Sequence, residues 1–171
     1  RGNLVKLCVL PCNGEEIKQY QKTLERMFAA LSENVQLRGV ALIDGDKGKP
    51  TPNPERTQNY IRFQQLNCHE TENLYLADEV LQSMGLTWDL AKEKLLRDAE
   101  KFGPKADAIR AISGADRKSI DLKSTINQIA EILDPKQLNW SMRLGKFLGS
   151  AAPTGMLKEY IGPVSDFIWR P

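Results

Sequence analysis

The alternation of apolar and polar residues predicts a strand, a helix and a second strand at the start of the chain. Residues 4–10 are predicted to form a buried strand that ends at Pro11. Apolar residues then recur at spacings of three and four across residues 17–31, which predicts an amphipathic helix. Residues 36–43 end in a continuous apolar run, typical of a parallel strand covered on both faces. The pattern therefore predicts a right-handed βαβ unit.

The pattern changes to a helical one after a third predicted strand. A basic loop with three prolines separates residues 36–43 from an alternating strand at residues 60–66. Helices are expected near residues 77–84, 88–102, 106–112, 122–133, 139–148 and 156–161. We therefore expect an α/β core with a mostly parallel sheet over residues 1–84, followed by a helical part over residues 85–171.

Composition and charge narrow the class of protein without identifying a partner. The 171 residues are 41% hydrophobic and 27% charged, which excludes a disordered chain and a collagen-like repeat. No apolar run reaches the length of a membrane helix, so no membrane contact is expected. The net charge of +2 neither favours nor excludes nucleic acid. Because the chain starts without methionine or a leader segment, we expect it to be part of a longer polypeptide.

Cysteine and histidine offer little catalytic or metal-binding chemistry. The three cysteines, Cys8, Cys12 and Cys68, are too few and too irregular for a disulfide framework, which favours a reducing, cytoplasmic setting. A zinc site formed by them would lack the usual paired spacing. The single histidine, His69, excludes a multi-histidine metal site.

Acidic residues follow two of the predicted strands. Asp44 and Asp46 come directly after a buried strand, where residues two apart point to the same side. Two close carboxylates repel unless a cation lies between them, and Mg²⁺ prefers oxygen ligands. Glu70 and Glu72 repeat this spacing after the next strand. An ordinary Asp-Gly turn, and acidic residues that merely lead a helix, remain open alternatives.

Lys146 adds a positive charge in the helical part. It follows Gly145 in an apolar helix, where a lysine can reach a phosphate as a point charge or can simply be solvated. A phosphate-binding P-loop is excluded, because its Gly-rich spacing after a strand is missing.

Three of these segments together resemble the TOPRIM domain of the overcoming-lysogenization-defect (OLD) family of ATP-dependent endonucleases. Residues 44–46 are similar to its D-x-D motif, residues 70–76 to its E-x-E-N-Y/L segment, and residues 139–148 to its late D-W and G-K-x-L segment. The motifs occur in the family's order and span most of the chain. One element is missing, because no glutamate in an EG-type turn follows the first strand; Glu15 and Glu16 follow what would be the second. The resemblance therefore implies a TOPRIM-like, Rossmann-like domain whose first unit lies upstream of Arg1 or is missing.

This resemblance implies a metal-dependent endonuclease that cleaves DNA with two Mg²⁺ or Mn²⁺ ions. It implies metal ligation by Asp44, Asp46, Glu72 and Glu70, with Asp44 and Glu72 also catalytic and Lys146 stabilising the charge of the reacting phosphate. In this reading, the proline-loop residues Lys47, Lys49 and Arg56 contact the DNA backbone, unless they only line a solvated loop. The implied partners are DNA, an N-terminal ATPase domain in the same longer chain and a second copy of the chain. Phage defence is the setting that the resemblance suggests.

Two other functions remain open. A haloacid-dehalogenase-like phosphatase also places D-x-D after a buried strand, but it needs Thr or Val soon afterwards, whereas Lys47 and Gly48 follow here. The other alternative is a non-catalytic TOPRIM-like module that binds DNA or a protein partner. The absence of the upstream glutamate is the feature that favours this second alternative.

Overall fold

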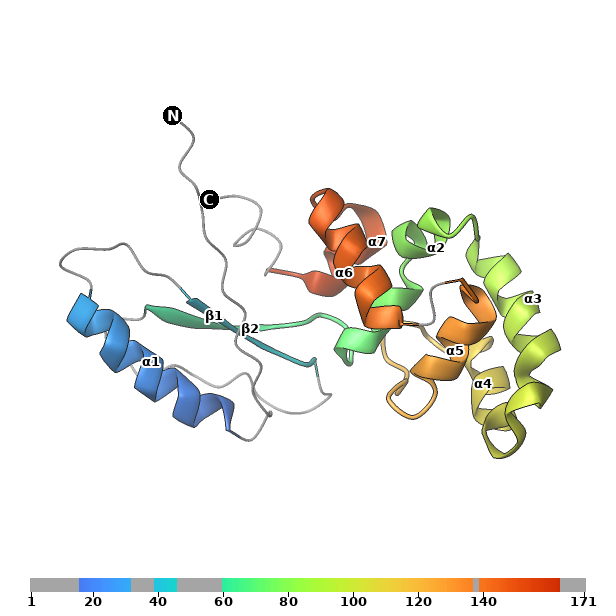
Figure 1. Ribbon diagram of the computed structural model, residues 1–171, viewed down its shortest axis with the longest axis horizontal. Coiled ribbons are helices and arrows are strands. Elements are labelled where there is room, and N and C mark those ends of the chain that lie inside the picture. The colour runs from blue at the N-terminus through green and yellow to red at the C-terminus, as the bar shows by residue number, and fades with distance from the viewer. Residues whose placement is uncertain (1–15, 32–38, 46–59, 137–138, 164–171) are drawn as a thin grey trace. The chain divides into compact units, whose positions relative to one another are not determined.

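The computed structural model describes residues 16–31, 39–45, 60–136 and 139–163. It shows a mixed α/β chain with a small parallel sheet of two strands and mostly helices (Figure 1). The elements in order are α1 (Ile17–Leu31), β1 (Gly39–Ile43), β2 (Ile61–Gln65), the 3₁₀ helix η1 (Thr71–Leu76), α2 (Asp78–Ser83), α3 (Trp88–Asp98), the 3₁₀ helix η2 (Ala99–Lys105), α4 (Ala106–Ile112), α5 (Ile126–Leu133), α6 (Trp140–Ser150) and α7 (Gly155–Ile161).

The chain forms two compact units. The first comprises residues 1–43 and 52–63, and the second comprises residues 44–51 and 64–171. This is a different division from the one at residues 84 and 85 that the sequence suggests. Among the helices in the described ranges, none is both long and apolar enough to cross a membrane.

The first unit holds α1 against the strands. The carboxylate of Glu25 accepts hydrogen bonds from the backbone N–H groups of Tyr60 (3.1 Å) and Ile61 (2.7 Å), so α1 is tied to the start of β2. A side chain at Gly39 would have its Cβ 3.0 Å from Ile61 and 3.5 Å from Phe28, which explains why a glycine begins β1. The predictions of a helix at residues 17–31 and of strands near residues 36–43 and 60–66 are confirmed within the described ranges. The predicted strand at residues 4–10 and the proline loop lie outside them.

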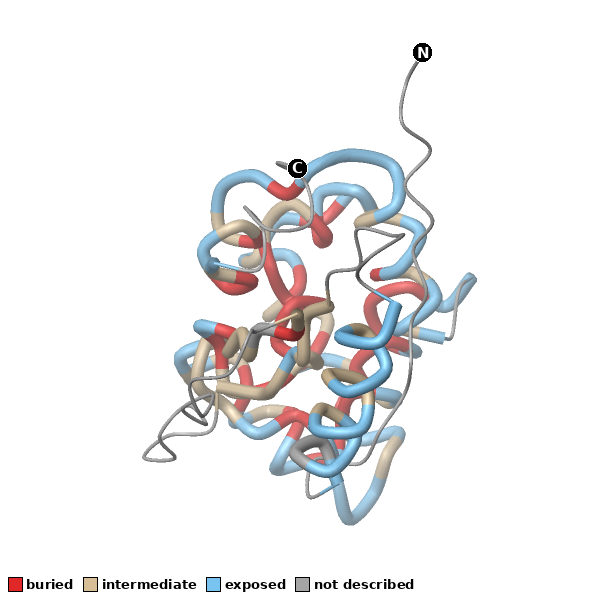
Figure 2. Tube along the Cα trace, turned by 90° about the vertical axis from the view of Figure 1, so that its left-hand side faces the viewer, coloured by how far each residue is buried: buried red, intermediate tan, exposed pale blue. Residues whose placement is uncertain are grey.

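The second unit contains the main hydrophobic core. Its fully buried side chains come from η1, α2, α3, α4, α5, α7 and the segment before α5: Tyr75, Leu76, Val80, Leu81, Leu95, Ile109, Ile112, Leu122, Ile129 and Leu157. Figure 2 marks the buried positions in red. η1 lies at the centre of this arrangement, because it contacts α2, α6 and α7.

Local capping signals explain where two of these helices begin. Thr87 accepts a hydrogen bond from the Leu90 N–H and starts α3, and Asn139 accepts one from the Met142 N–H and starts α6. The predicted helix at residues 122–133 begins later, at Ile126, because residues 122–125 form turns. Those turns matter for the site, since they place backbone N–H groups where an acidic side chain accepts them.

Candidate functional site

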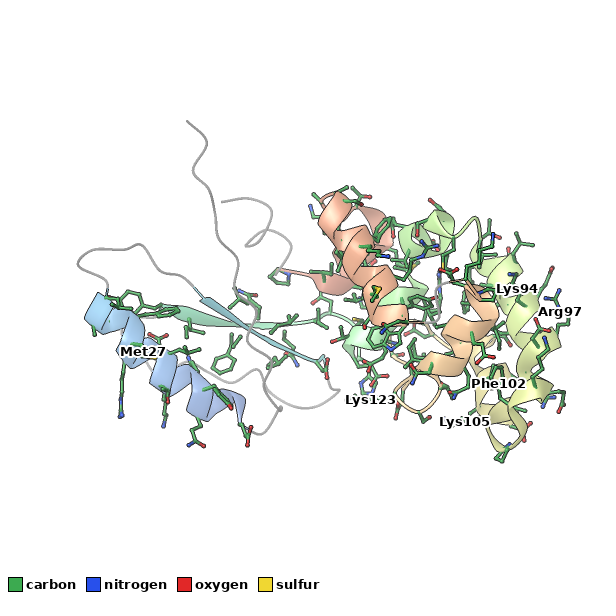
Figure 3. All side chains as sticks on the ribbon, viewed as in Figure 1. Met27, Lys94, Arg97, Phe102, Lys105 and Lys123 are labelled. Carbon is green, nitrogen blue, oxygen red and sulfur yellow. The ribbon has the colours of Figure 1, made fainter. Side chains whose placement is uncertain are left out.

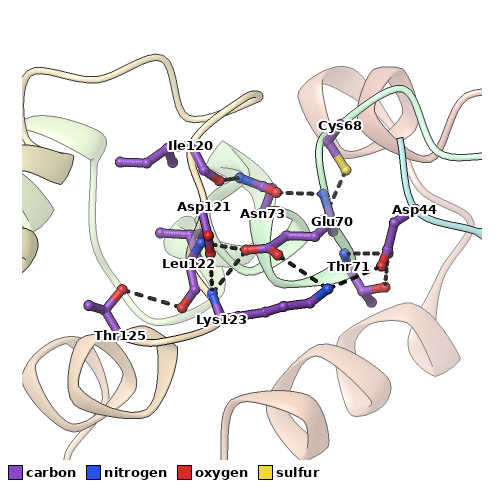
Figure 4. Close-up of polar contacts among 10 residues, drawn as sticks. All are labelled: Asp44, Cys68, Glu70, Thr71, Asn73, Ile120, Asp121, Leu122, Lys123 and Thr125. Carbon is purple, nitrogen blue, oxygen red and sulfur yellow. Dashed lines mark hydrogen bonds and ion pairs between the residues drawn. The ribbon is translucent and has the colours of Figure 1, made fainter. Parts of the chain in front are cut away.

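Asp44 lies at the carboxyl end of β1, and its side chain is fixed by the start of η1. Its Oδ1 atom accepts hydrogen bonds from the backbone N–H and the hydroxyl of Thr71, each at 3.2 Å (Figure 4). Its backbone carbonyl accepts a bond of 3.3 Å from the Gln65 side chain. A Cβ at Gly45 would collide with the carbonyl oxygens of Leu66 and Cys68, so glycine is needed there for the chain after Asp44 to pass so close.

Glu70 precedes η1 and is a buried carboxylate with a structural task. It is only 2% exposed, and its Oε1 atom accepts the backbone N–H groups of Leu122 and, at 3.0 Å, Lys123. These two donors are 52 and 53 residues away in sequence, so this carboxylate joins η1 to the segment before α5. Burial of an acidic side chain is tolerated here because backbone donors satisfy it.

Asn73 completes this connection from inside η1. Its Oδ1 atom accepts the backbone N–H of Glu70 at 2.8 Å, while its Nδ2 atom donates to the carbonyls of Arg117 (2.8 Å) and Ile120 (2.9 Å). The side chain is fully buried. Glu70 and Asn73 therefore hold residues 117–123 against η1 by four hydrogen bonds, to two backbone N–H groups and two carbonyls, and Figure 4 draws all of them except the bond to Arg117.

Lys123 brings a positive charge to this carboxylate group. Its Nζ atom lies 3.7 Å from Asp44 Oδ2 and 3.8 Å from Glu70 Oε2, and its side chain is 62% exposed. Figure 3 labels Lys123 in the segment that precedes α5. Sequence reasoning missed this residue. It lies 53 residues beyond Glu70 in a stretch without periodicity, so no local signal marks it.

Glu72 lies in the first turn of η1 and is partly buried. Burial raises the pKa of its carboxyl group, and the negative charges of Glu70 and Asp44 raise it further, while Lys123 lowers it. The three carboxylates are therefore close enough to repel one another.

The structure describes some of the remaining predicted site residues but not all of them. Lys146 lies on the exposed side of α6, two positions after the buried Leu144. Asp46, Lys47, Lys49 and Arg56 lie outside the described residues, as do Cys8 and Cys12.

Cys68 is a core residue beside the site. Its thiol donates to the Glu70 carbonyl at 3.3 Å, and burial raises its pKa to about 12, which makes it a poor metal ligand. The neighbouring His69 donates its backbone N–H to the Lys118 carbonyl at 2.8 Å. Both residues thus take part in fixing the segment between β2 and η1.

A cavity of about 210 Å³ opens next to the segments that carry Asp44 and Glu70. It is lined by Gly45, Asn67, His69, Asp116, Lys118 and Ser119, and two of these adjoin Asp44 and Glu70 in sequence. In the part of the chain that the structure describes, no group of three or more His, Cys, Asp or Glu side chains is arranged to hold a metal ion. The carboxylate oxygens of Asp44 and Glu72 nevertheless suit Mg²⁺, which binds through one or two carboxylates and keeps several water ligands.

This arrangement brings charged groups from three segments of the chain together. It offers two partly exposed carboxylates, one buried carboxylate that shapes the loop, and one lysine. Comparisons of the chain with protein-family models, with curated proteins and with solved structures give no match.

Proposed function

We propose that this chain carries the catalytic domain of a metal-dependent endonuclease that hydrolyses DNA phosphodiester bonds. The observation that supports this most is the pair of carboxylates Asp44 and Glu70, which two strand-end segments bring within 3.7 and 3.8 Å of Lys123, with Glu72 in the first turn of η1. The proposal includes a TOPRIM-like fold of the OLD type, in a longer cytoplasmic chain with an ATPase domain. It also includes a second copy of the chain as a partner and a role in phage defence.

The acidic side chains have different roles in this proposal. Asp44 and Glu72, with Asp46 from outside the described residues, would hold Mg²⁺ or Mn²⁺. The fit is supported by the chemistry of the donors: Asp44 Oδ2 lies 3.7 Å from the Lys123 ammonium, and Glu72 is a partly buried carboxyl group whose pKa is raised first by burial and then by the charges of Glu70 and Asp44. When bound, such ions supply Lewis acidity and a nucleophilic water to phosphodiester hydrolysis.

Glu70 has a different part, because its Oε1 atom is occupied by backbone donors. We assign it the positioning of η1 against residues 117–123, rather than the direct ligand role that the family resemblance implies. Thr71 acts in the same way on Asp44, since its N–H and hydroxyl fix the orientation of that carboxylate.

Positive side chains bind the substrate in this proposal. Lys146 stabilises the negative charge that develops on the reacting phosphate. Lys47, Lys49 and Arg56 contact phosphates along the DNA backbone, which orients the duplex without selecting its sequence.

The test is cleavage of supercoiled plasmid by the intact protein with Mg²⁺ or Mn²⁺. Asp44→Asn keeps an oxygen for the Thr71 donors but removes the charge, and we expect at least a roughly hundredfold slower cleavage. Asp89→Asn removes an exposed carboxylate paired with Lys92 on α3 and serves as the matched control, with cleavage unchanged. Full metal-dependent nicking by Asp44→Asn would refute the site.

A non-catalytic DNA-binding or partner-binding module is the second candidate. It is favoured by the occupation of Glu70 and by the lack of a three-residue metal group among the described side chains. Binding of DNA in a mobility-shift assay, with no cleavage under any metal, would support it. Hydrolysis of p-nitrophenyl phosphate that is lost in Asp44→Asn would instead support the phosphatase alternative.

A further inference from the structure

Asn67 lines two cavities of the second unit, and an ion pair joins their walls. The smaller, of about 210 Å³, is the one described above, which Lys118 and Ser119 also line. The larger, of about 510 Å³, is lined by Glu159 and other residues of α7 and the turn after it. Lys118 Nζ lies 2.7 Å from Glu159 Oε1, so an ammonium from the lining of the smaller cavity is paired with a carboxylate from the lining of the larger one.

The smaller cavity has a polar lining in which Lys118 carries a positive charge. Asp116 is the acidic residue of this lining, and both of its oxygens accept hydrogen bonds from its own turn. Its Oδ2 atom accepts the Ser119 hydroxyl at 2.6 Å, and its Oδ1 atom accepts the Lys118 N–H at 3.0 Å. Because these bonds partly neutralise the carboxylate, the lining suits a small anion that takes the Lys118 ammonium as its partner.

The Lys118–Glu159 pair can separate while the surrounding structure stays in place. The two side chains are 35% and 60% exposed, and ion pairs of this kind contribute little to stability. The backbone of Lys118 is held independently, since its N–H donates to Asp116 and its carbonyl accepts the His69 N–H at 2.8 Å. α7 is held by its own buried side chains. An anion can therefore replace Glu159 beside Lys118 at low cost.

The smaller cavity also adjoins both acidic segments of the candidate site. Gly45 lines it and directly follows Asp44, and His69 lines it and directly precedes Glu70. A phosphate oxygen offers an ammonium the same charge-assisted hydrogen bond as a carboxylate oxygen does. DNA that reaches the carboxylates can therefore place a neighbouring phosphate in this cavity.

We propose that the smaller cavity binds a phosphate group of the DNA backbone next to the one that is cleaved, and that Glu159 occupies Lys118 until DNA binds. The inference rests on the proposed function, because that function supplies DNA as the ligand. Lys118 is then a DNA-binding residue, and Glu159 is a competitor from within the same chain. Removal of the lysine and removal of the carboxylate should therefore change DNA affinity in opposite directions.

Fluorescence anisotropy of a labelled DNA duplex with the intact protein in EDTA tests this without metal or cleavage. Loss of one phosphate contact lowers the slope of log affinity against log salt concentration by about 0.9. Lys118→Gln is expected to bind more weakly and with this smaller slope, while Lys118→Arg keeps the wild-type slope. Glu159→Gln removes the competing carboxylate, and we expect about twofold to fivefold tighter binding at an unchanged slope.

The Lys92–Asp89 pair on α3 is the matched control, because it has the same separation of 2.7 Å and a lysine of similar exposure, 32%. Lys92→Gln and Asp89→Asn should leave both the affinity and the slope unchanged. Thermal melting shows which variants are folded, and Glu159→Gln decides the question if Lys118→Gln does not fold.

Wild-type affinity and slope in Lys118→Gln, or unchanged or weaker binding in Glu159→Gln, would overturn the inference and leave the proposed function standing. If DNA binding depends on both residues as expected but no metal supports cleavage, the inference stands and the catalytic part of the proposed function fails. If the wild type binds no DNA, both are wrong. Displacement of the DNA by inorganic phosphate at constant ionic strength would assign the cavity to the free ion and overturn its assignment to DNA.

Discussion

Replacement of Glu70 is expected to separate the structural role of this carboxylate from any role in chemistry. In Glu70→Ala, the buried Leu122 N–H loses its acceptor, whereas the Lys123 N–H keeps Asp121 Oδ1 at 3.1 Å. One unsatisfied buried donor costs about 1–3 kcal/mol, and the truncated side chain also leaves unfilled space. We expect Glu70→Ala to lose about 3 kcal/mol of unfolding free energy, or roughly 6–12 °C in melting temperature.

Glu70→Gln sharpens this test, because the amide oxygen can still accept both N–H groups. Only the charge and its long ion pair with Lys123 are lost, so we expect a cost of about 1 kcal/mol. Urea unfolding at neutral pH measures both variants, with Glu72→Gln as the control on the next acidic position. Equal losses in the alanine and glutamine variants, or no loss in either, would refute the assignment of Glu70 as an acceptor for this segment.

Four further predictions address the same site. Asn73→Asp should cost about 3 kcal/mol or more in urea unfolding, because it removes the amide group that donates to two partly buried carbonyls and adds a charge beside Glu70. Since the pKa of Glu72 is raised, the folded protein binds this proton more tightly than the unfolded chain does, and stability should fall as pH rises from the ordinary carboxyl range through the folded pKa. Glu72→Gln should flatten this part of a profile of melting temperature against pH. Lys146→Ala should slow plasmid cleavage while Mn²⁺ binding by calorimetry stays unchanged, and equal cleavage would make Lys146 an ordinary surface lysine. Cys68, with a pKa near 12 and a buried thiol, should resist iodoacetamide in the native protein and react only after unfolding, as mass spectrometry would show.

Sequence reasoning succeeds here where a signal is local. Periodicity at spacings of three and four marks α1, and the capping residues Thr87 and Asn139 mark the starts of α3 and α6. The alternating segment before Leu66 marks β2. Each of these signals lies within the element that it predicts, so one sequence is enough to find it.

The site depends instead on contacts between distant segments. The spacing of Glu70 and Glu72 suggests two equivalent carboxylates, yet one accepts backbone donors and the other is partly exposed with a raised pKa. The difference arises because residues 117–123 fold back onto η1, which no local pattern indicates. Lys123 and Asn73 enter the site for the same reason, and sequence reasoning assigned neither of them a role in it.

The hydrogen bonds accepted by Glu70 also determine when the site can form during synthesis of the chain. Its partners, Leu122 and Lys123, are synthesised 52 and 53 residues later, at roughly 5–20 residues per second. For several seconds the carboxylates of Asp44 and Glu72 therefore exist without the segment that positions them. A ribosome-bound chain that stops before residue 122 contains these acidic residues but not the finished site, so maturation of the site awaits the start of α5.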